Sequence, residues 1–163
     1  IINSCKGFYV IPHSNYGSGS IKLRFNNGGT LLGYANWVNN DANRSGVSYS
    51  LNLPKKNYLF TGDKGFHYLP KNQMRTHYDA IMACHHGAEI ENNFIPKAAS
   101  PNAVACFSFG FNEHFRHPRT SAIEQAYDYK IKGTSECLDW YKKGIKPNSV
   151  KEYKKISIRV KLS

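Results

Sequence analysis

Long apolar runs are absent from the 163-residue sequence, and a membrane-spanning helix needs about 20 apolar residues, so we expect no membrane segment. Cysteine is scarce as well. The four cysteines form no CxxC pair, which argues against a zinc knuckle or a thioredoxin-type motif. Cys84 and Cys106 lie in apolar runs typical of buried thiols, which favours a reduced, cytoplasmic setting, with extracellular disulfides as the alternative. The sequence begins without Met or a signal-peptide pattern, so we expect it to be part of a longer protein.

Acidic residues are few, with 11 Asp and Glu against 22 Lys and Arg, which gives a formal net charge of +11. Such an excess of positive charge concentrates polyanions around a protein and is typical of nucleic-acid binding. A basic surface that only aids solubility is the alternative. The basic residues gather toward the C-terminal end: Lys130, Lys132, Lys142, Lys143, Lys146, Lys151, Lys154, Lys155, Arg159 and Lys161. This clustering favours nucleic acid or another polyanion as the partner.

Aromatic residues are plentiful, with 11 Tyr and 9 Phe, which favours strands over a helical bundle. Residues 20–25 alternate apolar and polar, and the Asn-Asn-Gly-Gly sequence at 26–29 predicts a hairpin turn before a strand at 30–37. Further strands are expected at 7–11, 47–53, 58–60, 78–84, 103–109 and 155–162, and helices at 120–129 and 135–143. The polar segment up to Met74 is expected to be helical in part. The sequence therefore predicts one mixed α/β domain rich in strands.

Three of the expected buried strands end directly before residues that can bind a metal. These residues are Asp63, His85, His86, His114 and His117. Loops at the ends of rigid strands can bring such side chains into one cleft, and imidazole and carboxylate groups suit Zn²⁺. Each piece also has a simpler interpretation: Asp63 could cap a helix, and the two adjacent histidines could be ordinary polar side chains. The order and spacing of all the pieces together favour a metal site.

The motifs that carry this pattern resemble those of one family. Residues 59–63 read LFTGD, residues 79–87 read DAIMACHHG, and residues 104–118 lead from an apolar run through Asn112 to His117-Pro118. In this order they look like the second half of a metallo-β-lactamase-fold domain. The nearest branch is that of bacterial DNA-uptake channel proteins and their stand-alone relatives. The resemblance covers about residues 40–125, and the segment 126–163 follows it as a basic helix and strand.

The resemblance implies an αββα sandwich with a metal cleft along one edge of its two sheets. Asp63 matches the carboxylate that bridges two metal ions, and His85 and His86 match the paired histidines beside the cleft. His117 matches the late histidine, which is a metal ligand or contacts the substrate. His13 faintly resembles an earlier histidine ligand, although a surface-loop histidine is the alternative. The implied cofactor is a divalent metal, as two Zn²⁺ ions or as Mn²⁺.

The implied activity is metal-dependent hydrolysis, and the basic composition favours a phosphodiesterase or nuclease over a lactamase. Asp63 and His117 are the catalytic candidates, and Lys64, Arg116 and Arg119 are the basic residues beside the motifs that we expect to contact nucleic acid. A non-catalytic module that binds nucleic acid or docks a partner is the alternative function.

The sequence departs from the family at one point, because the main metal-binding signature, HxHxDH, is absent. That signature normally precedes everything matched above. Two explanations compete: the N-terminal half of the domain lies elsewhere in the protein or on another polypeptide, or the domain has degenerated. We expect the first, with residues 1–163 forming a single incomplete domain whose missing half is a partner.

Overall fold

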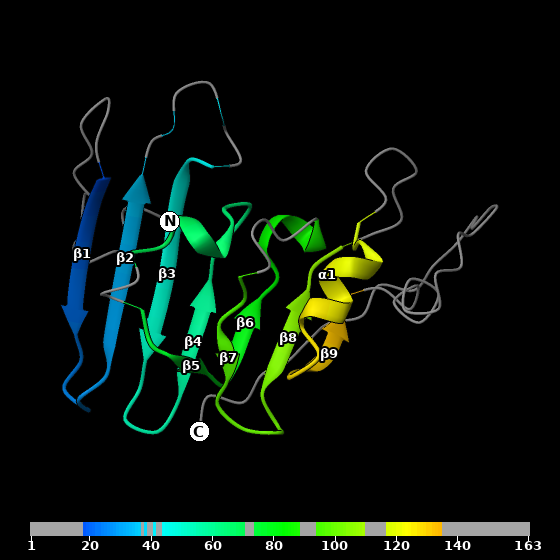
Figure 1. The fold of residues 1–163 in the computed structure, drawn as a ribbon. Helices are drawn as coiled ribbons and strands as arrows, with labels where there is room; N and C mark the ends of the chain where they lie inside the picture. Colours follow the sequence, from blue (N-terminus) through cyan, green and yellow to red (C-terminus); the bar gives the residue numbers. More distant parts are fainter. Residues whose placement is uncertain are drawn as a thin grey trace.

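Seven strands form one mixed sheet in the computed structural model, which describes residues 18–36, 38, 41, 44–70, 74–88, 94–109 and 117–134 (Figure 1). The order across the sheet is β1-β2-β3-β4-β6-β8-β9. These strands are β1 (Ser18–Arg24), β2 (Thr30–Asn36), β3 (Gly46–Asn52), β4 (Asn57–Phe60), β6 (Ala80–Met82), β8 (Val104–Phe107) and β9 (Lys130–Gly133). The first four strands pair antiparallel, and β4, β6, β8 and β9 pair parallel. The expected strand-rich, mixed architecture is therefore confirmed.

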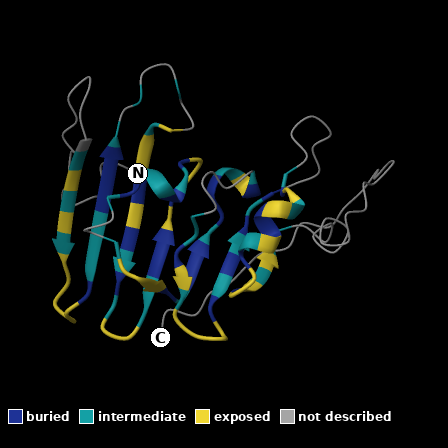
Figure 2. Ribbon diagram, viewed as in Figure 1, coloured by how far each residue is buried: buried dark blue, intermediate teal, exposed yellow. Residues whose placement is uncertain are grey.

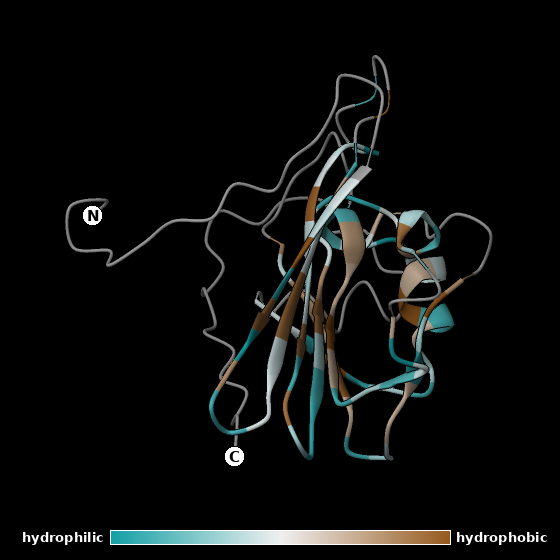
Figure 3. Cartoon of the chain, turned by 90° about the vertical axis from the view of Figure 1, so that its left-hand side faces the viewer, coloured by the Kyte–Doolittle hydropathy of each residue, from teal (hydrophilic) through white to brown (hydrophobic). Residues whose placement is uncertain are grey.

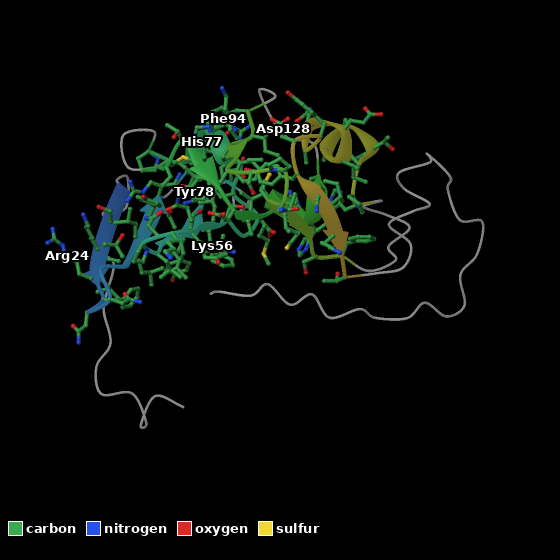
Figure 4. All side chains as sticks on the ribbon, turned by 90° about the horizontal axis from the view of Figure 1, so that it is seen from below. Arg24, Lys56, His77, Tyr78, Phe94 and Asp128 are labelled. Carbon is green, nitrogen blue, oxygen red and sulfur yellow. The ribbon has the colours of Figure 1, made fainter. Side chains whose placement is uncertain are left out.

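The remaining described elements are short and lie on one side of this sheet (Figure 3). They are the two-stranded parallel sheet of β5 (His77–Tyr78) and β7 (Lys97–Ala98), the 3₁₀ turns η2 (Phe66–Tyr68) and η3 (Cys84–Gly87), and the helix α1 (Thr120–Gln125). Seen from below in Figure 4, His77, Tyr78 and Phe94 lie on the side of the sheet that α1 occupies. No helix among the described residues is long and apolar enough to span a membrane.

The hairpin turn between β1 and β2 follows from its Asn and Gly residues. Gly28 has φ 83°, a backbone angle that suits glycine, and its N–H donates to the Phe25 carbonyl at 3.0 Å. The Asn27 side chain accepts a bond from the Gly29 N–H at 3.0 Å. The predicted turn at residues 26–29 is confirmed.

The core lies between the sheet and the short elements. Figure 2 shows that buried residues concentrate on the central strands of the sheet. Alternate residues of a strand point to opposite faces, and one row across this inner face runs Ser50, Leu59, Ile81, Ala105 and Ile131. Leu59, Ile81 and Ala105 are buried and share a hydrophobic cluster with residues of α1. The buried centre of the sheet therefore comprises β4, β6 and β8.

The opposite side of the sheet, which we call the outer face, is also apolar. Tyr49 and Phe60 lie side by side on β3 and β4, with Val47 and Leu51 on the same face. Val47, Tyr49 and Phe60 remain 40%, 41% and 41% exposed. Single exposed apolar residues are ordinary, but neighbouring ones mark a surface suited to another layer.

The structure corrects the single strand that we expected at residues 78–84. The segment divides into β5 and β6 at Asp79, and its last residue, Cys84, begins η3. Asp79 exchanges two bonds with Asn57, since its N–H donates to the Asn57 carbonyl and its carboxylate accepts the Asn57 N–H at 2.9 Å. Its carbonyl accepts the Val104 N–H. These bonds turn the chain from the small sheet into the large one.

Other elements are shorter than we predicted, or lie outside the described residues. The helix expected at 120–129 ends at Gln125, and the described part of the polar segment before Met74 contains only the turn η2. The strands expected at 7–11 and 155–162 and the helix expected at 135–143 lie outside the part of the chain that the structure describes.

Buried tyrosines make the fold sensitive to alkali. The Tyr129 hydroxyl donates to the Pro96 carbonyl at 2.8 Å, and burial raises its pKa above that of a free phenol. Burial likewise raises the pKa of Tyr34 to about 12 and raises the pKa of Tyr58. Because the folded state keeps protons that the unfolded state loses, these groups stabilise the fold fully below about pH 10. That stability declines as the pH rises through the folded pKa values.

We therefore expect the free energy of unfolding in urea to fall as the pH rises above about 10, by at most about 1.4 kcal/mol per pH unit for each phenol that stays protonated in the folded state. Tyr129→Phe removes one such group, so its loss over this range of pH is smaller, although it is less stable near neutral pH by about 1 kcal/mol for the missing hydrogen bond. If the free energy of unfolding fell equally steeply with pH in the wild type and in Tyr129→Phe, the raised pKa of Tyr129 would be contradicted.

Candidate functional site

Three parallel strands end at the same edge of the sheet, and the residues predicted to bind metal follow them. β4, β6 and β8 are neighbours, and their carboxyl ends point the same way (Figure 1). Asp63 lies in the turn after β4, and His85 and His86 lie in η3 after β6. His117 lies in the chain between β8 and α1. Parallel strands thus place residues that are far apart in the sequence at one edge of the sheet.

Backbone hydrogen bonds join these loops directly. The His85 N–H donates to the Gly62 carbonyl at 3.0 Å, which links η3 to the turn after β4. The Arg119 N–H donates to the Gly87 carbonyl at 2.7 Å, which links the chain after His117 to η3. The loops therefore form one connected structure.

The paired histidines have an unusual backbone. His85 has φ 46° and ψ 47°, and His86 has φ 56° and ψ 17°, both in the left-handed region. That region costs a residue with a side chain about 1–2 kcal/mol. Such strain persists only where the surroundings impose it, and it clusters at functional sites. Here the left-handed backbone directs two adjacent imidazoles toward the site.

The site side chains lie close to one another and are partly open to solvent. His86 Nε2 lies 3.6 Å from Asp63 Oδ1, and these side chains are 56% and 48% exposed. The ring centroids of His85 and His117 are 5.1 Å apart, and those of His85 and His86 are 6.4 Å apart. Asp63, His85, His86 and His117, which the sequence singled out, are thus brought together in space.

The Ser108 carbonyl fixes the proton on one nitrogen of His86. His86 Nδ1 lies 2.6 Å from the Ser108 oxygen, and since a carbonyl can only accept, Nδ1 must carry the hydrogen. In the neutral ring, Nε2 then presents a lone pair toward Asp63 Oδ1. Two acceptors facing each other repel unless a proton or a cation lies between them. This arrangement suits a ring whose Nε2 binds a positive ion.

The surroundings of His117 favour its neutral form. Burial lowers its pKa below the ordinary value, and the neighbouring side chains of His85, Arg119 and His86 lower it further. The carboxylate of Asp63 acts in the opposite direction and more weakly. A neutral imidazole can accept a proton or bind a metal, so His117 is ready for either role near neutral pH.

The four side chains are of the types that bind a metal, but they do not surround one common point. One carboxylate and three imidazoles are the ligand types of Zn²⁺ sites. Among the described residues, no group of three or more His, Cys, Asp or Glu side chains lies close enough to hold a metal ion. The contacts form two pairs, Asp63 with His86 and His85 with His117. A metal would require these pairs to move together or to be joined by further ligands.

The structure corrects the role expected of Lys64 and leaves that of Arg119 open. Lys64 is only 1% exposed, and its Nζ donates to the Gly46 carbonyl at 2.8 Å, so it is not available to contact nucleic acid. Burial lowers the pKa of this ammonium to about 8. Arg119 is exposed at the N-cap of α1, beside His117. His13, His114 and Arg116 lie outside the described residues.

Sequence reasoning missed several residues on which the site depends. The Ser108 carbonyl acts through its backbone, so its residue type gives no signal. Gly87 was quoted only as part of a motif, yet a Cβ there would lie 2.6 Å from both Phe107 and Pro118, and its φ is 87°. A glycine directly after two histidines is the signal that could have indicated such close packing. Comparisons with protein-family models, curated proteins and solved structures gave no match for this chain.

Proposed function

We propose that this chain carries part of the metal site of a metallo-β-lactamase-type hydrolase that acts on nucleic acid or another phosphate ester. The observation that carries the proposal is the meeting of Asp63, His85, His86 and His117 at one sheet edge. These residues come from separate loops, and their order along the chain matches the family's order. The left-handed backbone of both histidines further supports a functional role for this edge.

In this proposal the imidazoles and the carboxylate bind the cation, and the Ser108 carbonyl orients His86 for binding. A divalent ion held there, as two Zn²⁺ or as Mn²⁺, would supply a water of lowered pKa. Asp63 would be a ligand of that ion, and neutral His117 would accept a proton or contact the substrate. Arg119, exposed beside His117, steadies negative charge on a phosphoryl oxygen.

The basic composition supports a polyanionic substrate. The net charge of +11 raises the concentration of nucleic acid near the protein, and binding of this kind weakens steeply with added salt. The alternative is a module that binds nucleic acid or docks a partner without catalysis. It gains support because the described residues contain no converging set of three ligands. Bound metal distinguishes the two functions.

The outer face of the sheet supports the finer proposal of a sandwich. Its exposed apolar residues Val47, Tyr49 and Phe60 would pack against a second sheet, with the apolar sides of the two layers in contact. We propose that this second layer belongs to the half of the domain that bears HxHxDH, and that it supplies further ligands. An incomplete ligand set in this chain is what such a division of the site would produce.

Metal binding by the chain tests the proposal. After loading with Zn²⁺ and dialysis near neutral pH, we expect the wild type to retain zinc on the ligands that this chain itself supplies, measured by elemental analysis and calorimetry. A His85→Ala, His117→Ala double variant loses two imidazole ligands, so its affinity falls by more than about 100-fold. His77→Ala is the matched control, because His77 is exposed on β5 and bonds Thr76.

Retention of zinc by His77→Ala together with its loss from the double variant would support the site. A wild type that retains no metal but binds DNA in a salt-dependent way would favour the non-catalytic module instead.

A further inference from the structure

Lys64 is a buried cation directly beside the site. It is 1% exposed and is among the largest fully buried side chains of the described residues. Its Nζ donates to the Gly46 carbonyl at 2.8 Å and lies 3.5 Å from the Tyr34 carbonyl. Both acceptors are neutral, so they offset only part of the cost of removing an ammonium from water. A methionine of similar length would avoid that cost, so the ammonium calls for a role other than stability.

The contacts of Lys64 extend across the sheet. The residue closes the turn that carries Asp63, since its N–H donates to the Thr61 carbonyl at 3.3 Å. Its side chain reaches back past that turn to β3 and β2, where Gly46 and Tyr34 lie. A second bond runs the same way, from the Ser48 hydroxyl of β3 to the Thr61 carbonyl at 3.3 Å. The turn is therefore fastened to the antiparallel half of the sheet.

The other side of this turn faces the histidines. The Gly62 carbonyl accepts the His85 N–H, and the Asp63 carboxylate lies 3.6 Å from His86 Nε2. Neighbouring residues of the turn thus point in opposite directions: Asp63 is 48% exposed toward the site, while Lys64 is buried away from it. Because the Lys64 side chain fixes the backbone of this turn, it also fixes the position of the Asp63 carboxylate.

We propose that Lys64 is a positioning residue whose ammonium anchors the Thr61–Lys64 turn, and so holds Asp63 and the Gly62 carbonyl against the paired histidines. Its effect on metal binding rests on the proposed function, whereas its effect on the turn does not. Lys64 touches neither substrate nor metal and acts through the backbone of Asp63. Anchoring by a long buried side chain allows the carboxylate itself to stay at the surface.

The variant Lys64→Met tests the proposal, with Lys55→Met, an exposed lysine in the turn before β4, as the matched control. In metal-free protein, we expect the amide of His85 to exchange with solvent about tenfold faster in Lys64→Met, because its acceptor Gly62 is no longer fixed. The amide of Ala83, which donates to Cys106 within the same segment, exchanges at the wild-type rate. The thermal midpoint stays the same or rises, because a desolvated charge has been removed.

In zinc-loaded protein, Lys64→Met weakens zinc binding by about 10-fold or more, as substitutions behind a ligand commonly do. Equal His85 exchange in Lys64→Met and Lys55→Met would overturn the proposal. The proposal is also overturned if the Ala83 and His85 amides both exchange faster while the stability of the protein falls. Such a result would mean that Lys64 has a purely structural role. If Lys64→Met does not fold, Lys64→Gln replaces it, because glutamine keeps an N–H donor but has a shorter side chain. The same exchange and zinc-binding results then decide. A wild type without zinc affinity overturns the proposed function, and the metal-free exchange still tests Lys64.

Discussion

Replacing Asp63 by Asn lowers the hydrolysis of a phosphodiester by about 10³-fold in the complete protein, if the proposed function holds. Asn keeps the size of the side chain but removes the charge that faces His86 at 3.6 Å. Stabilisation of a reaction by a bound metal amounts to several kcal/mol, and each 1.36 kcal/mol corresponds to a factor of about 10 in rate. The measurement is kcat and KM with a nucleic-acid substrate at saturating Zn²⁺ or Mn²⁺.

The control for Asp63→Asn is Asp128→Asn, which removes an exposed carboxylate beyond the end of α1 (Figure 4). It should cleave the substrate at the wild-type rate, because Asp128 follows the helix and makes no described contact with the paired histidines. Equal cleavage by Asp63→Asn and the wild type would refute the hydrolase proposal.

Replacing Gly87 by Ala destabilises the protein by about 2–5 kcal/mol, the sum of a left-handed backbone and an overpacked core. A Cβ at this position would lie 2.6 Å from Phe107 Cδ1 and 2.6 Å from Pro118 Cβ, and φ is 87°. Both neighbours are fully buried and have no room to withdraw. The measurement is urea unfolding followed by circular dichroism.

Gly28→Ala separates the two causes. Gly28 has φ 83°, close to that of Gly87, but the nearest atom to its Cβ would be Pro54 Cγ at 3.9 Å, an ordinary contact. Its substitution should therefore cost only the backbone share, about 1–2 kcal/mol. Equal losses in the two variants would mean that the contact of η3 with Phe107 and Pro118 is not tight, and that the site lacks the rigidity described above.

Much of the fold was accessible from the sequence where local chemistry decides the structure. The Asn-Gly turn at 26–29 and the alternation that precedes it determine the first hairpin, because Gly28 and Asn27 satisfy the turn locally. The division of the strand at 78–84 was not accessible. It depends on Asp79, whose partners Asn57 and Val104 are distant in sequence.

The candidate site likewise combines residues that the sequence indicated with contacts that only the folded chain creates. The pattern of strand ends indicated Asp63, His85, His86 and His117, and the parallel pairing of β4, β6 and β8 in the structure places them at one edge. The prediction that Lys64 contacts nucleic acid was wrong. Lysine is rarely buried, so the sequence favoured an exposed side chain. The carbonyls that accept from its ammonium lie on β2 and β3, far away in the sequence. Likewise, only the folded chain places the Ser108 carbonyl against His86.

The central claim is that Asp63 and the histidines at the ends of β4, β6 and β8 bind a metal. X-ray absorption at the zinc edge of the loaded protein tests it most directly. We predict nitrogen and oxygen ligands alone at about 2.0–2.2 Å, with the outer-shell scattering of imidazole. Sulfur at about 2.3 Å would assign the metal to cysteine instead, and the absence of bound zinc would leave this edge without a metal; either result would contradict the claim.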